Sequence, residues 1–176
     1  LQNNTDFLCV LGTTAETPTL TEEEKKKIKK MVIERVNGKI PILLGVGGNN
    51  TRAIVETLKN DDFTGVDAIL SVVPYYNKPS QEGIYQHYKA ISEATDLPIV
   101  LYNVPGRTGV NMKAETTLRI ARDFKNVIAI KEASGDVSQM DDIIKNKPAN
   151  FDVISGDDGI TFPLITLGAV GIISVI

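Results

Sequence analysis

Lys131 is the residue whose type and position most directly suggest covalent chemistry in this chain. It ends an apolar, strand-like run at residues 127–130, where an ammonium group has little to stabilise it. Such a lysine either extends to water, which is the commoner state, or is held partly desolvated as a reactive amine. Burial lowers the pKa of a lysine, and a neutral amine can attack a ketone carbon to form a Schiff base. The surrounding residues decide between the two.

Tyr102 and Arg107 bring a hydroxyl and a guanidinium to the end of another apolar run. A Tyr102 hydroxyl in a pocket would relay protons to a carbinolamine or enamine, although a core tyrosine with a hydrogen-bonded hydroxyl fits the pattern equally well. Arg107 lies in a Pro-Gly-Arg-Thr-Gly turn, and its planar fork of donors suits a carboxylate. An ordinary surface arginine is the alternative there.

Thr13 and Thr14 follow a further strand-like run, where their hydroxyls either hold a second carboxylate or cap a turn. Asp157 and Asp158 are adjacent on one turn and rarely converge on one ion without further ligands, so we predict no catalytic metal. The lone cysteine, Cys9, lies within an apolar run and is interpreted as a core residue.

Short apolar runs rich in Val and Ile recur regularly and predict seven strands, at residues 7–11, 40–45, 68–73, 98–102, 127–131, 151–155 and 169–175. They are continuous rather than alternating, as in parallel strands covered on both faces. Helices are predicted between them at 21–36, 51–60, 81–94, 113–124 and 138–146, with a brief one within 159–167. The only histidine, His87, falls in the third of these helices, as a surface or packing residue.

Strand and helix alternating in this way predict a parallel α/β fold, either a closed barrel or an open doubly wound sheet. Polar, glycine-rich clusters follow almost every strand, and this even spread favours a (β/α)₈ TIM barrel with its site at one mouth. Such a barrel needs eight strands and roughly 250 residues. We therefore interpret residues 1–176 as a partial barrel domain of about seven strands.

Composition narrows the classes of partner. The chain has 176 residues, 42% hydrophobic and 23% charged, with a net charge of -3, so it predicts a globular domain without a basic surface for nucleic acid. No apolar stretch approaches the length of a membrane span, and one cysteine allows no internal disulfide. We expect a cytoplasmic protein with no membrane partner.

Five motifs together carry a resemblance to a known family: GTTAE at 12–16, PYYNKPSQEG at 74–83, YNVPGRTG at 102–109, IKEASG at 130–135 and SGDD at 155–158. With them the chain resembles the 4-hydroxy-tetrahydrodipicolinate synthase family over essentially its whole length. The resemblance implies a (β/α)₈ barrel of which this chain lacks the first strand and an added C-terminal helical region. It also implies a homo-oligomer, a dimer of tight dimers.

The resemblance implies condensation of pyruvate with L-aspartate 4-semialdehyde, in the diaminopimelate and lysine pathway. Lys131 would form the Schiff base, so no separate cofactor is expected. Thr13, Tyr102 and Tyr76 would form a proton relay, with Tyr76 reaching into the neighbouring subunit's site. The substrate contacts implied by the resemblance are Thr14 for pyruvate, Arg107 for the aldehyde's carboxylate, and backbone groups of Gly156 and Ile173 near the imine.

Two alternatives differ in the aldehyde or in the class of protein. Related Schiff-base lyases act on sugar acids such as N-acetylneuraminate or keto-deoxy sugar acids, and Arg107 favours the synthase over them. A non-catalytic barrel that binds a 2-keto acid has no need for an amine beside a proton relay. Lysine-inhibited family members carry histidines and a glutamate at positions that align with Glu22, Lys25 and Ala53, so we expect weak or absent lysine inhibition.

Overall fold

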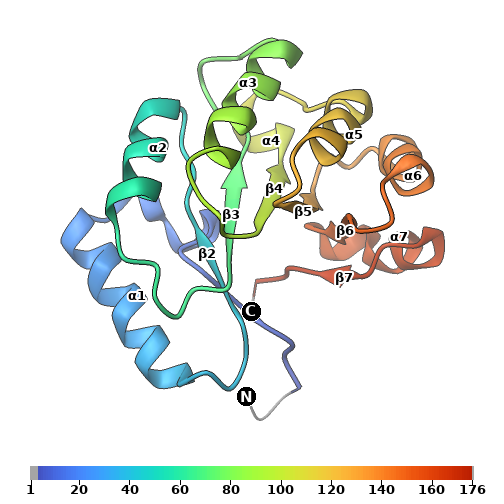
Figure 1. Ribbon diagram of the computed structural model, residues 1–176. Helices are drawn as coiled ribbons and strands as arrows, with labels where there is room; N and C mark the ends of the chain where they lie inside the picture. The colour runs from blue at the N-terminus through green and yellow to red at the C-terminus, as the bar shows by residue number, and fades with distance from the viewer. Residues whose placement is uncertain (1–3, 176) are drawn as a thin grey trace.

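The computed structural model describes residues 4–175, in which seven strands form one sheet (Figure 1). Every neighbouring pair is parallel, and the strands lie side by side in chain order. The strands are β1 (Leu8–Val10), β2 (Ile42–Gly45), β3 (Ala68–Val72), β4 (Ile99–Asn103), β5 (Val127–Glu132), β6 (Asp152–Ser155) and β7 (Gly171–Ile172). The predicted parallel α/β class is confirmed.

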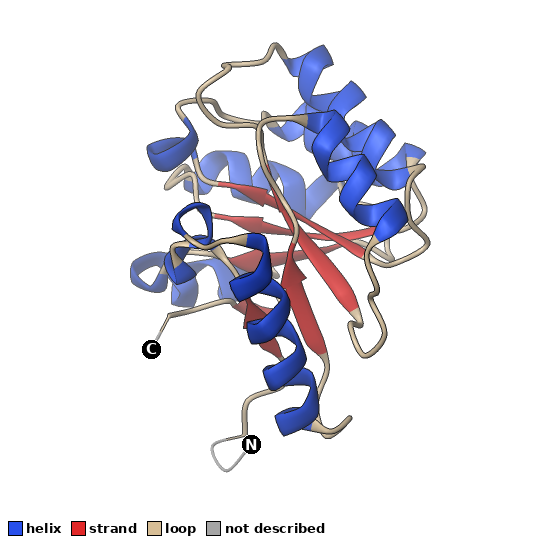
Figure 2. Ribbon diagram, turned by 90° about the vertical axis from the view of Figure 1, so that its left-hand side faces the viewer, coloured by secondary structure: helices blue, strands red, loops and turns tan. Residues whose placement is uncertain are grey.

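Helices connect successive strands and cover one face of the sheet, which curls so that its other face turns inward (Figures 1 and 2). They are α1 (Glu22–Val36), α2 (Thr51–Asn60), α3 (Gln81–Ser92), α4 (Pro105–Thr108), α5 (Ala114–Asp123), α6 (Val137–Asn146) and α7 (Thr161–Leu167). Short 3₁₀ turns follow β1, at Thr13–Ala15 and Thr17–Thr19, and β6, at Asp158–Ile160. Outer helices on a curled parallel sheet are the arrangement of a (β/α) barrel, as predicted.

Two apolar clusters stabilise the sheet from its two faces. The larger lies between the strands and the helices, and includes Ile69, Ile99 and Ile130, none of them exposed to solvent. The smaller lies on the inner face and includes Val100 and Tyr102. Alternate residues of a strand point to opposite faces, so a strand covered on both sides is apolar throughout. This explains the continuous apolar runs of the sequence.

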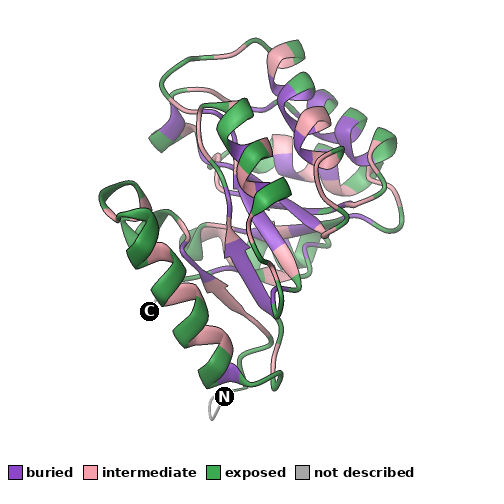
Figure 3. Cartoon of the chain, turned by 60° about the vertical axis from the view of Figure 1, so that its left-hand side comes forward, coloured by how far each residue is buried: buried purple, intermediate pink, exposed green. Residues whose placement is uncertain are grey.

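The amino end of α1 is closed by a capping box between Thr21 and Glu24. The Glu24 backbone N–H donates to the Thr21 hydroxyl at 3.3 Å, and the Thr21 N–H donates to the Glu24 carboxylate at 2.8 Å. This capping box satisfies two donors that have no partner inside the helix. Val36 is the only fully buried residue of α1, whose partly buried Ile28, Val32 and Ile33 pack against the larger cluster while its outer side is exposed (Figure 3).

The last strand is shorter than predicted. The run at residues 169–175 predicts a full strand, but β7 covers only Gly171–Ile172. The backbone N–H of Ala169 donates to the Leu164 carbonyl at 2.9 Å and so still closes the end of α7. Pairing with β6 therefore begins late, with Val170 N–H on the Val153 carbonyl, and ends with Ile173 N–H on the Ser155 carbonyl. Ile176 lies outside the described residues.

Candidate active site

Lys131 lies near the end of β5 with its side chain on the inner face of the sheet, directly beside Tyr102 of β4. Its Nζ is 4.5 Å from the centroid of the Tyr102 ring, and the residue is only 8% exposed. The extended, solvated lysine considered from the sequence is therefore not the state observed. The structure instead holds an amine against an aromatic ring inside the curled sheet.

An irregularity in β5 sets this pairing. Ile99 pairs with Val127, but the next residue, Val100, pairs with Ala129, so Ile128 is an extra residue in the manner of a β-bulge. From there the register runs regularly to the Tyr102–Lys131 pair. A slip of one residue turns a side chain to the opposite face. The bulge thus determines that Lys131 shares a face with Tyr102.

Burial lowers the pKa of the Lys131 amine, because desolvation disfavours the ammonium form. The Cys9 thiol and the Asp158 carboxylate act in the opposite direction, and the Arg107 guanidinium lowers the pKa further. A lowered pKa increases the fraction of neutral, nucleophilic amine near neutral pH. The environment of Lys131 is therefore suited to attack on a carbonyl carbon.

Tyr102 supplies a hydroxyl that is protonated at neutral pH. Burial raises its pKa, while the Arg107 guanidinium and a hydrogen bond with Thr13 lower it to a smaller extent. Tyr102 and Thr13 line the same hollow at the carboxyl ends of the strands. A buried phenol in the same hollow as a second hydroxyl can pass a proton between solvent and a reacting group. The structure brings Lys131, Tyr102 and Thr13 together.

A second hollow adjoins the first and shares Tyr102 and Arg107 with it. It contains four other residues expected from the sequence: Thr14, Lys131, Gly156 and Ile173. The glycine is needed there, because a Cβ at Gly156 would lie 2.9 Å from the Cε of Lys131 and 2.9 Å from the Cβ of Ala133. Gly156 therefore leaves the space through which the Lys131 side chain passes.

The turn that carries Thr13 and Thr14 depends on an unusual backbone just before it. Leu11 has φ 56°, a left-handed conformation that costs a branched residue free energy. This places its carbonyl oxygen against β2, only 2.0 Å from where a Cβ at Gly45 would lie. The Thr17 hydroxyl lies 3.1 Å from the Leu11 carbonyl oxygen and 3.0 Å from that of Gly12. The left-handed backbone of Leu11 and its close approach to Gly45 thus position the turn that carries Thr13 and Thr14 at the mouth of the barrel.

Arg107 lies on α4, a single helical turn formed by the Pro-Gly-Arg-Thr part of the turn expected from the sequence. Gly109 ends this helix with φ 74°, and the buried Thr108 hydroxyl donates to the carbonyls of Val104 and Val110 at 3.2 and 2.9 Å. The Arg107 side chain remains exposed at the mouth. Its donors are therefore free to meet a carboxylate arriving from solvent.

The whole chain matches a known protein family. Residues 1–176 match the Dihydrodipicolinate synthetase family. The chain belongs to this family. It is 86% identical to the 4-hydroxy-tetrahydrodipicolinate synthase of Phocaeicola vulgatus and 80% identical to that of Parabacteroides distasonis, in both cases over 100% of this chain and 59% of the relative. The chain thus spans about three fifths of the length of these relatives.

Solved structures of the family share the fold. The dihydrodipicolinate synthase of Thermotoga maritima matches with a TM-score of 0.95 and 50% identity, over 99% of this chain and 60% of that one. The enzyme from Aquifex aeolicus matches with a TM-score of 0.94 and 41% identity, over 99% and 59%. The resemblance and the barrel-type architecture predicted from the sequence are confirmed.

Tyr76 is the one predicted catalytic residue that lies apart from the others. It has φ 69°, it is 87% exposed, and it lines neither hollow of the site. The neighbouring Tyr75 lines the first hollow instead. An aromatic side chain held so far into solvent is unusual for its apolar area. The role in a neighbouring subunit's site that the family resemblance implies for Tyr76 stays a prediction.

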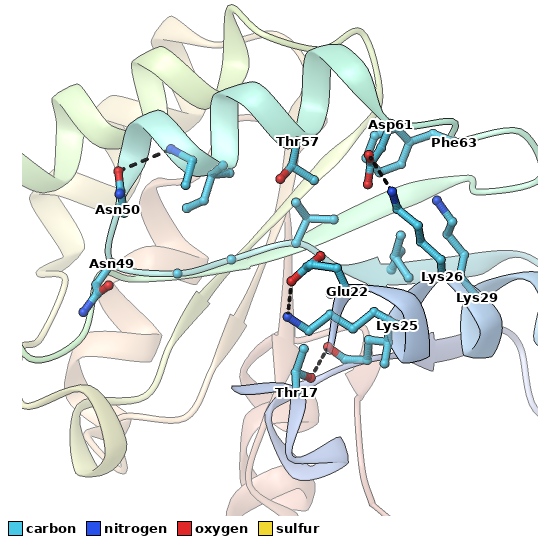
Figure 4. A pocket seen from close by; sticks show the side chains of 18 of the residues that line it. Thr17, Glu22, Lys25, Lys26, Lys29, Asn49, Asn50, Thr57, Asp61 and Phe63 are labelled. Carbon is cyan, nitrogen blue, oxygen red and sulfur yellow. Dashed lines mark hydrogen bonds and ion pairs between the residues drawn. The ribbon is translucent and has the colours of Figure 1, made fainter. Parts of the chain in front are cut away.

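The residues that the family resemblance aligns with a lysine pocket line a further hollow between α1, α2 and the end of β2 (Figure 4). It adjoins the first hollow of the site and shares Lys25 and Tyr75 with it. Lys25 forms an ion pair at 2.7 Å with Glu22 on the same helix, and Lys26 lies 3.8 Å from Asp61. Ala53 contributes only a methyl group to its wall. The hollow thus contains the ammonium groups of its own lysines, which repel a second ammonium group.

Two other residues discussed from the sequence, Cys9 and His87, pack inside the protein. Cys9 packs against the inner cluster, and burial raises the pKa of its thiol, with a smaller opposing effect of Lys131. His87 is buried on α3 with Nδ1 2.8 Å from the Thr51 hydroxyl, and burial lowers its pKa to about 4. His87 is therefore neutral at pH 7 and packs between helices.

Two negative findings apply to the described part of the chain. Within residues 4–175 no group of three or more His, Cys, Asp and Glu side chains is placed to hold a metal ion. No helix in the same range is both long and apolar enough to cross a membrane.

Sequence reasoning missed the polar residues that end β4 and β5. Asn103 and Glu132 have no solvent exposure and are hydrogen-bonded to each other. Each directly follows a predicted site residue, Tyr102 or Lys131. The available signal was a charged residue placed at the end of a continuous apolar strand, immediately after the lysine.

Proposed function

We propose that this protein condenses pyruvate with L-aspartate 4-semialdehyde, giving 4-hydroxy-tetrahydrodipicolinate, through a Schiff base on Lys131. The observation that carries the proposal is the position of that amine, which is buried, has a lowered pKa, and lies 4.5 Å from the centroid of the Tyr102 ring. Family membership and relatives that are named 4-hydroxy-tetrahydrodipicolinate synthase support the choice of reaction. Residues 1–176 would be part of the catalytic barrel.

The first stage activates pyruvate. The neutral Lys131 amine attacks the ketone carbon, and the carbinolamine loses water to give an imine. The methyl carbon of the imine then loses a proton and becomes the nucleophilic carbon of an enamine. Tyr102, with Thr13 as its hydrogen-bond partner, would donate and accept these protons. The imine supplies the electron sink, so we propose that no further cofactor takes part.

The second stage joins and releases the product. The enamine carbon attacks the aldehyde carbon of the semialdehyde, and the new alkoxide takes up a proton. The amino group of the semialdehyde unit then attacks the imine carbon, closing the ring and releasing the Lys131 amine. Arg107 would bind the semialdehyde carboxylate, and Thr14 the pyruvate carboxylate. Backbone groups of Gly156 and Ile173 would lie beside the imine.

Tyr76 would complete the proton relay from a neighbouring subunit. Its high exposure and left-handed backbone support a role beyond its own chain. We therefore propose a homo-oligomer, a dimer of dimers, in which each site takes one tyrosine from its partner. A reducing cytoplasm is the proposed compartment, because a single cysteine provides no disulfide.

Related lyases that act on sugar acids are the second candidate, because they would use the same amine and tyrosine. The exposed guanidinium of Arg107 at the mouth favours a charged aldehyde over a neutral sugar. Condensation assays with pyruvate plus aspartate semialdehyde, and with pyruvate plus sugar aldehydes, distinguish the two. We expect activity with the semialdehyde only, and Arg107→Ala should impair it selectively. Equal or higher activity with a sugar aldehyde would reject the proposal.

A further inference from the structure

Three neighbouring strands end in a buried polar residue. Asn103 of β4, Glu132 of β5 and Ser155 of β6 are paired in register and have no solvent exposure. Because side chains alternate along a strand, these three point to the helix-covered face, whereas Tyr102 and Lys131 point inward. In Figure 1, α5 and α6 lie over this part of the sheet. Three polar side chains therefore lie on the opposite face of the sheet, directly behind Tyr102 and Lys131.

The Glu132 carboxylate is bound only by N–H donors. The Asn103 side-chain amide donates to both of its oxygens at 3.1 Å. The backbone N–H of Ser134 donates to Oε1 at 2.8 Å, and the side-chain amide of Gln139 donates to Oε2 at 3.2 Å. An ionised carboxylate accepts hydrogen bonds and donates none. The surroundings of Glu132 are therefore complementary to a carboxylate and not to an amide.

The two amides that bind Glu132 have fixed orientations. The Asn103 Oδ1 accepts from the Met112 N–H at 3.0 Å, and the Gln139 Oε1 accepts from the Asn111 side chain at 2.8 Å. Turning either amide over would place donor against donor. The network thus joins the ends of β4 and β5 to the segment before α5 and to α6. Networks of this kind are rigid when every member is satisfied.

We propose that Glu132 is the positioning residue for Lys131, holding the ends of β4 and β5 together through Asn103 and Gln139. The proposal rests on the Schiff-base role of Lys131 given above. Glu132 directly follows Lys131 in the sequence, and its hydrogen-bond partner Asn103 directly follows Tyr102. A change in the angle of either strand end therefore moves the amine relative to the phenol. A misplacement of about 1 Å can cost roughly 100-fold in rate.

Gln139 and Gln81 provide a matched pair of variants. Each half-buried side chain extends from a helix to the segment before α5. Gln81 donates to the Asn111 carbonyl at 2.8 Å, and its Oε1 accepts from the Lys113 N–H at 3.0 Å. Only Gln139 also contacts Glu132. Gln139→Ala and Gln81→Ala thus remove similar hydrogen bonds to the segment before α5. Only Gln139→Ala also removes a hydrogen bond to the Glu132 carboxylate.

The experiment measures the rate at which pyruvate is trapped on Lys131 by borohydride, in protein of the full length of its relatives. We expect Gln139→Ala to lower the trapping rate and kcat roughly tenfold, with KM for pyruvate changed less than about twofold. Glu132→Gln should lower both rates by roughly 10- to 100-fold, because its amide places N–H groups against donors. Gln81→Ala should lower the melting temperature as Gln139→Ala does, with the wild-type trapping rate.

Equal trapping rates in Gln139→Ala and Gln81→Ala would overturn the positioning role. If Glu132→Gln does not fold, the comparison between the two glutamine variants decides alone. The proposed function fails separately, if wild-type protein gives no adduct with pyruvate. Wild-type trapping with no difference between the glutamine variants would reject only the role of Glu132.

Discussion

The amine side of the site, Lys131 and Tyr102, and its hydroxyl side, Thr13 and Thr14, are held by different physical means. All of β4 is buried, and the strand ends behind the amine are fixed by fully buried polar side chains. The Thr13–Ala15 turn contains no buried residue. It depends instead on the strained Leu11 backbone and the space at Gly45.

This difference suits the tasks proposed for the two sides. A lowered lysine pKa requires desolvation, and desolvation requires dense packing around the amine. A proton relay requires hydroxyls that can alternate between donor and acceptor, which an exposed turn permits. Replacing a glycine by alanine adds one methyl group, and on each side of the site one glycine lies where the structure leaves no room for that group. These substitutions therefore test the packing of the two sides.

Gly45→Ala should have the largest effect, on the hydroxyl side. Its Cβ would lie 2.0 Å from the Leu11 carbonyl oxygen, a backbone atom that cannot move aside alone. We expect the free energy of unfolding to fall by about 3 kcal/mol or more, measured by chemical denaturation. Gly48→Ala is the control, because its nearest contact is the Ile54 side chain at 3.8 Å. Equal unfolding midpoints for the two variants would refute the close approach.

Gly156→Ala tests the amine side and should act on catalysis more than on stability. The added methyl would lie 2.9 Å from the Lys131 Cε, whose flexible side chain can move, and 2.9 Å from the Ala133 Cβ. We expect kcat and the trapping rate with pyruvate to fall roughly 10- to 100-fold, with a smaller loss of stability than in Gly45→Ala. Gly159→Ala serves as control. A wild-type trapping rate in Gly156→Ala would show that the amine has more room than the structure gives it.

The pH dependence of imine formation should respond in opposite directions to two charges at the mouth. The neutral amine reacts, so the rate rises as pH increases through the lowered pKa of Lys131 and levels off below the ordinary value of 10.5. Asp158 raises the pKa of Lys131 and Arg107 lowers it. Asp158→Asn should therefore shift the rate profile to lower pH, and Arg107→Ala to higher pH. The pH profiles are measured by borohydride trapping with pyruvate alone. A shift of both variants in the same direction along the pH axis would contradict the opposite effects of the two charges on the pKa of Lys131.

Lysine should have the smallest effect, because the hollow behind the hydroxyl side holds its own ammonium groups. Lys25 pairs with Glu22, and Ala53 offers no charged partner to an incoming amino group. Steady-state assays should give weak or absent inhibition, and an inhibition constant below about 1 mM would contradict this. Replacing Glu22 and Lys25 by His and Ala53 by Glu, the types found in lysine-inhibited members, should increase the sensitivity.

The elements and the main site residues follow from the sequence because both depend on local patterns. Continuous apolar runs predict parallel strands, and strand ends in a barrel meet at one mouth, which brings Lys131 and Tyr102 together. The bulge at Ile128 leaves such a run uninterrupted, so it has no signature there. A left-handed Leu11 is equally invisible, since leucine seldom adopts that conformation.

Glu132 illustrates a second limit of sequence reasoning. A glutamate that follows a strand is usually solvated, and nothing in its own type predicts complete burial. The partners that stabilise it, Asn103 and Gln139, lie 29 and 7 residues away in the chain. Such a network becomes apparent only once the strands are in register.

The most direct test of the whole account is to locate the pyruvate adduct. Protein of the full length of its relatives is incubated with pyruvate and borohydride, digested, and its peptides are weighed by mass spectrometry. We predict one reduced adduct, on the peptide that contains Lys131, and none in Lys131→Arg. An adduct on a different lysine, or no adduct in the folded wild-type protein, would contradict the central role of this amine.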